Sequence, residues 1–205
     1  HGYPVYCFQI ERMGDLGNIS SYLETMVDAL HGRFRSMASQ QPALLNGNPR
    51  VMIAEESLQL ADAFSGLTLA EKLNRGMVTI NPPVRIGRYV HVAPGATLSE
   101  CNIDDDCEIG QESTIIRSSV GAGSIVGPGC YMEDTLTGIM VELHSTFAQP
   151  ITLQRYVAVG DEVVIRPGVN LTDFVTIHPR LKVPTGINVP ANTDIESAEQ
   201  MLEHL

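Results

Sequence analysis

The chain has 205 residues and a formal net charge of −11, from 13 basic and 24 acidic side chains. Such a surface repels phosphate backbones and anionic lipids, so we expect neither nucleic acid nor a membrane as a partner. Apolar residues make up 43% of the chain but aromatic residues only 5%, so Val, Ile and Leu must fill the core, which favours a stacked β architecture.

The first third of the sequence predicts a strand, a turn and an amphipathic helix. Residues 3–10 read as the strand, and the Gly14–Gly17 segment reads as a tight turn. Ser21 and Glu24 predict a capping box, His31-Gly32 predicts the helix end, and residues 40–50 predict a linker before shorter helices near 56–64 and 68–75. The apolar face of the predicted helix consists of Ile19, Tyr22, Leu23, Met26, Val27 and Leu30.

From Val78 onward, aliphatic residues recur every six positions, and Gly or Pro-Gly follows many of them at a fixed distance. Gly permits positive φ and Pro favours a turn, so each six-residue unit predicts a short strand and a bend. Three units close a triangular coil of about eighteen residues, which predicts a left-handed parallel β-helix. The predicted inward positions are Ile80, Ile86, Val92, Leu98, Ile103, Ile109, Ile115, Val120, Val126, Met132, Val141, Phe147, Leu153, Val159, Ile165, Leu171, Ile177, Val183, Val189 and Ile195.

The repeat has irregular places. Leu98–Ile103, Ile115–Val120 and Tyr131–Leu136 each carry a shortened step, which predicts the same trimmed corner in three successive coils. Residues 133–140 break the period and predict an extruded loop or a strained coil. Thr193-x-x-Glu196 predicts a capping box for a short C-terminal helix that closes the end of the coils.

One segment resembles a known family. Gly14–Thr25 resembles the Asp-Ile/Val-Gly-Thr-x-x-x-Tyr-Leu-x-Ala segment of sugar-1-phosphate nucleotidyltransferases, although Asn18-Ile19 stands where that family has Thr-Pro. In that family the segment closes the catalytic domain and a β-helix follows. The family's Gly-rich nucleotide-binding loop does not occur in this sequence, so we expect a C-terminal piece of a longer enzyme. The implied parts are the tail end of the catalytic domain (1–38), a linker with short helices (39–77), the β-helix (78–192) and a capping helix (193–205).

The resemblance implies an oligomerisation or regulatory portion of an enzyme of nucleotide-sugar biosynthesis. That enzyme converts an NTP and a sugar 1-phosphate to an NDP-sugar and pyrophosphate. Asp15 matches the family's carboxylate that helps hold Mg²⁺; alternatively, its side chain forms a Gly-flanked turn. We expect this piece alone to be inactive, to bind no cofactor, and to associate with itself as a homotrimer or dimer through the β-helix faces.

Two alternatives stay open. Hexapeptide-repeat acyltransferases that use acyl-CoA have a His general base between neighbouring subunits. The candidates here are His91, His144 and His178, and His144 is favoured because it borders the irregular stretch. The other alternative is a non-catalytic assembly module. A zinc site of the β-helical carbonic anhydrase type is excluded, because it needs two His close together on one coil, whereas these three lie 53 and 34 residues apart.

The four cysteines show no CxxC spacing, and no apolar run reaches about 18 residues. These features predict reduced thiols in a cytoplasmic protein without a membrane span.

Overall fold

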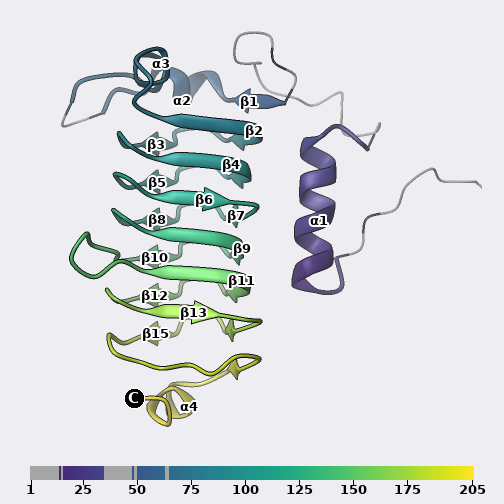
Figure 1. Cartoon of the computed structure of the whole chain (residues 1–205), viewed down its shortest axis with the longest axis vertical. Coiled ribbons are helices and arrows are strands. Elements are labelled where there is room, and N and C mark those ends of the chain that lie inside the picture. Colours follow the sequence, from purple (N-terminus) through teal and green to yellow (C-terminus); the bar gives the residue numbers. More distant parts are fainter. Residues whose placement is uncertain (1–13, 15, 35–47, 49, 63–64) are drawn as a thin grey trace, which may run out of the picture.

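A computed structural model describes residues 14, 16–34, 48, 50–62 and 65–205. Most of the described chain forms a parallel β-helix of about six turns, as predicted (Figure 1). Followed from β2 at one end to β16 at the other, the coils wind in the left-handed sense. The strands are β1 (Val51–Ile53), β2 (Thr79–Ile86), β3 (His91–Val92), β4 (Thr97–Ile103), β5 (Glu108–Ile109), β6 (Thr114–Ile116), β7 (Ser119–Val120), β8 (Ile125–Val126), β9 (Tyr131–Thr137), β10 (Glu142–Leu143), β11 (Thr152–Val159), β12 (Val164–Ile165), β13 (Asn170–Thr172), β14 (Thr176–Ile177), β15 (Lys182–Val183) and β16 (Asp194–Ile195).

The stacked strands make three flat faces. Face 1 consists of β6, β13 and the first halves of the long strands β2, β4, β9 and β11. Face 2 consists of the second halves of those strands with β1, β7, β14 and β16, and face 3 consists of β3, β5, β8, β10, β12 and β15. The long strands bend from face 1 into face 2 at a corner where Glu100, Arg117 and Asp134 have positive φ in three successive coils. This trimmed corner confirms the predicted shortened step in the first two coils; in the third the step runs from Met132 to Thr137, one residue later than predicted.

Aliphatic side chains fill the axis of the coils at nearly all the predicted positions. Leu98, Ile115 and Ile165 are fully buried, and Leu98 pairs with Ile115 one coil further on. Phe147 is an exception, because its side chain is 55% exposed. The prediction of an inward Phe147 was therefore wrong.

The predicted loop at residues 133–140 was also wrong. These residues continue β9 and turn an ordinary corner, and the extra residues of this coil project between β10 and β11, at 144–150 (Figure 1). The period fails at 133–140 because polar side chains, Thr135 and Thr137, take two of the buried positions. Thr137 rather than Leu136 follows Val120 in the stack. The Thr135 hydroxyl donates to the Leu153 carbonyl at 3.1 Å, so burial leaves it hydrogen-bonded.

Three helices lie at the ends of the β-helix. α2 (Glu55–Gln59) and α3 (Leu69–Asn74) lie beside the first coil, where the sequence predicts two short helices, although α2 is shorter than expected. Lys72 of α3 is buried, and its Nζ donates to Asp62 at 2.9 Å and to the Val92 carbonyl at 2.7 Å. At the other end, α4 (Ala198–Leu202) begins after the N-cap Ser197, so the predicted Thr193–Glu196 capping box was wrong.

The remaining helix, α1 (Ile19–Leu30), lies along the side of the β-helix and contacts β2, β4, β9 and β11 (Figure 1). Its N-cap is Asn18, whose side chain accepts from the Ser21 amide, so the predicted Ser21–Glu24 box was wrong. His31 ends the helix, as predicted. The strand predicted at residues 3–10 lies outside the described residues. None of the described helices is long and apolar enough to cross a membrane.

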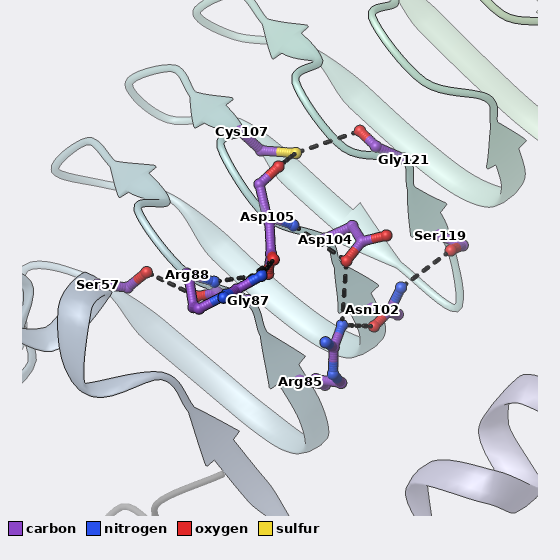
Figure 2. Close-up of polar contacts among 10 residues, drawn as sticks. All are labelled: Ser57, Arg85, Gly87, Arg88, Asn102, Asp104, Asp105, Cys107, Ser119 and Gly121. Carbon is purple, nitrogen blue, oxygen red and sulfur yellow. Dashed lines mark hydrogen bonds and ion pairs between the residues drawn. The ribbon is translucent and has the colours of Figure 1, made fainter. Parts of the chain in front are cut away.

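Polar side chains form ladders on the outside of face 2. Figure 2 shows Arg85 donating to Asn102 at 2.9 Å, and Asn102 donating to Ser119 at 3.3 Å, across three coils. At the next corner, Asp105 accepts from the Arg88 amide and guanidinium (Figure 2), and these hydrogen bonds lower the pKa of the Asp105 carboxyl. The ladders fix the first coils in one register.

Candidate functional site on face 3

A histidine and a glutamate lie side by side on β10. Leu143 points into the axis and is buried, so Glu142 and His144 on either side of it point outward. The Nε2 atom of His144 is 2.7 Å from the Glu142 carboxylate. Both side chains are nearly half exposed, and the His144 amide donates to the Ile165 carbonyl at 2.9 Å. The strand therefore holds an accessible imidazole that a carboxylate can orient.

His144 stands where the chain leaves β10 for the loop at 144–150. The loop is anchored by Ser145, whose buried Oγ accepts from the Ile151 amide at 2.9 Å. A turn between Thr146 and Gln149 closes it, and Phe147 in this turn lies against Gly129. The loop thus places an exposed aromatic ring at the edge of face 3.

Three more exposed apolar side chains lie on face 3 or at the corner that leads into it: Ile125 of β8, and Ile139 and Met140 just before β10. Ile125 is 42% and Met140 57% exposed. The Met140 sulfur lies over Gly123 at one corner, Phe147 lies over Gly129 at the other, and Ile125 of β8 lies between the two glycines in sequence. We call Ile125, Ile139, Met140 and Phe147 the apolar band.

Charged residues flank the apolar band. In the stacked strands, Ile125 pairs with Glu108 on one side and with Glu142 on the other. His91 follows Glu108 in the same column, and Lys182 stands at the far end. An apolar centre with a charged surround is typical of a surface that binds another molecule.

The structure does not bring the three candidate histidines together. His91 and His144 lie on face 3, but the strands β5 and β8 separate β3 from β10. His178 lies on face 2, beside Asp194. Asp15, the predicted metal ligand, lies outside the described residues. Glu142 was missed from the sequence, although its spacing of two from His144 on a predicted strand would have identified it.

Three cysteines offer no reactive thiol. Cys101, Cys107 and Cys130 point into the coils and are buried. Burial raises the pKa of Cys101 and of Cys130 to about 12 and that of Cys107 to about 11. Because the thiolate is the nucleophile, these residues are not candidates for covalent catalysis.

The fold and the repeat define a hexapeptide-repeat β-helix. Among curated proteins, the chain is similar to the bifunctional protein GlmU. Two such proteins of Streptococcus agalactiae, from serotypes V and III, are each 30% identical over 149 residues. The match covers 68% of this chain and 30% of each relative. The GlmU protein of Bacillus velezensis is 26% identical over 116 residues, or 51% of this chain and 25% of the relative.

The match includes part of the β-helix. Wherever a stretch of 68% of the chain begins, it contains the middle of the sequence, where the first coils lie. The chain spans less than a third of the length of these relatives. No protein-family model matches it. The relatives and the fold confirm the predicted resemblance to sugar-1-phosphate nucleotidyltransferases that carry a β-helix.

Proposed function

We propose that this chain is the β-helical C-terminal portion of a cytoplasmic sugar-1-phosphate nucleotidyltransferase, and that it assembles the parent enzyme as a homo-oligomer. The similarity to GlmU, a bifunctional sugar-1-phosphate nucleotidyltransferase and acetyltransferase, supports the proposed class of the parent enzyme. The apolar band on face 3 is the observation that supports assembly.

A comparison of the three faces favours face 3 as the self-association surface. Face 1 presents a column of polar side chains that includes Thr97, Thr114 and Thr152. Face 2 is partly covered by α1. Face 3 combines flat, regular strands with the apolar band on β8, at the corner before β10 and in the loop after it, and burying these side chains in a symmetric interface removes them from water. We therefore expect a homotrimer or dimer whose subunits contact one another through face 3.

Nucleotide and sugar phosphate would be bound by the rest of the parent enzyme. There, Asp15 would contribute to a Mg²⁺ site, and the cation would offset charge on the reacting phosphates. Asp15 precedes α1 in sequence by a few residues, so the catalytic domain would join the β-helix beside face 2. We expect neither Mg²⁺ nor a nucleotide to bind this chain by itself.

The Glu142–His144 pair favours a second candidate function, an acyl transfer from acyl-CoA. His144 would take the proton of the acceptor hydroxyl or amine as its oxygen or nitrogen attacks the thioester carbonyl. The carbon–sulfur bond would then break, and the imidazolium would return the proton to the CoA thiolate. Glu142 would orient the ring and stabilise its charge. The loop at 144–150 and a neighbouring copy would enclose the thioester.

Calorimetric titration of the chain distinguishes the two functions. Acetyl-CoA is titrated in one series, and Mg²⁺ with a nucleotide sugar in another. The assembly function predicts no saturable heat in either series. Saturable binding of acetyl-CoA, together with a release of coenzyme A that His144→Ala abolishes and the control His91→Ala leaves unchanged, would support the acyltransferase instead.

A further inference from the structure

A groove runs between α1 and face 2 across the coils of β9, β11 and β14. Its volume is about 460 Å³, and Tyr22 of α1 forms one wall. The other wall consists of two columns of outward residues, one of which contains Ala158 and Thr176 and the other Gly160 and His178. Ala158 contributes only a methyl group to this wall, so the groove stays open beside it as far as His178, while Gly160 packs closely against Pro179 of the next coil.

Three possible metal ligands meet at this end of the groove. In the stack, Thr176 pairs with Asp194 and the buried Ile177 pairs with the buried Ile195. Residues next to a buried strand position point outward, so His178, Asp194 and Glu196 lie on the same outer surface. Their ligand atoms all lie within 4.8 Å of one another, and His178 Nε2 is 2.8 Å from Asp194 Oδ1.

We propose that His178, Asp194 and Glu196 bind a divalent transition-metal ion at the end of the groove. One imidazole and two carboxylates form a donor set that suits zinc and its neighbours, whereas Mg²⁺ prefers oxygen alone. Bonds of about 2.1 Å in a tetrahedral site place donor atoms about 3.4 Å apart. The side chains of His178 and Asp194 are 41% and 58% exposed, so they can adjust to that spacing.

The charges around the three residues favour a cation. Within the described part of the chain, neither Asp194 nor Glu196 forms an ion pair with Lys or Arg. The nearby Arg180 pairs with Glu162 and Arg155 with Asp173. The whole chain carries a net charge of −11. A divalent ion would offset these two carboxylates, which no Lys or Arg among the described residues neutralises.

The site would leave coordination positions open. Three protein ligands with a free position are typical of metal sites that bind a further ligand, whereas structural zinc sites have four protein ligands. His178 is both a ligand and part of the groove wall, so the free position would accept water or an oxygen atom of a molecule in the groove. This inference does not depend on assembly or on acyl transfer.

Zinc titration of the metal-free chain, followed by calorimetry, tests the site. One zinc ion per chain is expected for the wild type. His178→Ala, Asp194→Asn and Glu196→Gln should each weaken binding by about tenfold or more, and His144→Ala, which removes the other exposed His–carboxylate pair, should leave the affinity unchanged. No zinc binding by the wild type, or an equal loss in His144→Ala and His178→Ala, would overturn the proposal.

Two further measurements separate the metal site from a structural role. Far-ultraviolet circular dichroism should show the same folded β-helix in all variants, because the three side chains are exposed. Zinc should raise the melting temperature of the wild type but not that of His178→Ala, since binding to the folded state alone stabilises it. Mg²⁺ should bind at least about tenfold more weakly than zinc; equal binding of both ions would contradict a site with a nitrogen ligand.

Discussion

Single inward side chains decide whether the coils form. Ile165 is fully buried in the axis of the coils. Ile165→Asp should unfold the β-helix, because an unpaired buried carboxylate costs several kcal/mol out of a total of about 5–15. Thr114→Asp, on the outer surface of face 1 beside the buried Ile115, should melt close to the wild type. Thermal denaturation followed by circular dichroism compares them, and a stable Ile165→Asp variant would contradict the assigned inward positions.

The buried cysteines predict a specific alkaline response. Cys101 has a pKa of about 12 in the folded chain, against an ordinary value of 9.0. The unfolded state therefore loses this proton first, so the free energy of unfolding should fall as the pH rises above 9. At pH 8, iodoacetamide should leave Cys101, Cys107 and Cys130 unmodified in the folded protein and alkylate them in denaturant. Mass spectrometry of the peptides checks this, and rapid labelling of the folded chain would contradict their burial.

Residue patterns predict the core well but the candidate sites only in part. The six-residue period marks the inward aliphatic positions because each strand and corner of a coil uses six residues. It cannot mark Thr135, whose hydroxyl is satisfied by a carbonyl of the next coil. Asp194 lies next to His178 only because the coils stack in a particular register. That register, unlike the period, depends on where loops and trimmed corners fall.

At the scale of elements, α3 is fixed to the first coil by one buried cation. Lys72→Ala should lower the free energy of unfolding by about 3 kcal/mol, because it removes a buried ion pair and the hydrogen bond to Val92. Lys182→Ala is the matched control, since Lys182 is exposed on face 3, and it should change the stability by less than about 0.5 kcal/mol. Urea denaturation measures both; equal effects would show that the Lys72 pair contributes nothing.

The sequence pattern of a helix predicts the helix itself but not what it packs against. The apolar face of α1 predicts a helix that must pack against something, but amphipathicity does not identify the partner. The structure shows that α1 contacts strands of face 2, and that its residues Leu23 and Leu30 are buried. Helix caps were assigned to neighbouring Ser and Thr residues, because several capping residues occur close together at both α1 and α4.

At the scale of the whole molecule, the three faces have different surfaces. Face 1 is largely polar, face 2 has α1 and the groove, and face 3 has the apolar band and the Glu142–His144 pair. Assembly through face 3 would leave the groove on face 2 accessible. The assembly proposal and the metal-site proposal therefore concern different faces and can be tested separately.

Sedimentation equilibrium is the most direct test of assembly through face 3. The wild-type chain should sediment as a dimer or trimer of its 22.3 kDa mass. Ile125→Glu should shift it to the monomer, because a charge in the apolar band opposes burial. Ile116→Glu is the matched control on the outer surface of face 1 and should leave the oligomer intact. A wild-type chain that stays monomeric at all concentrations, or an Ile125→Glu variant with the wild-type mass, would contradict the account.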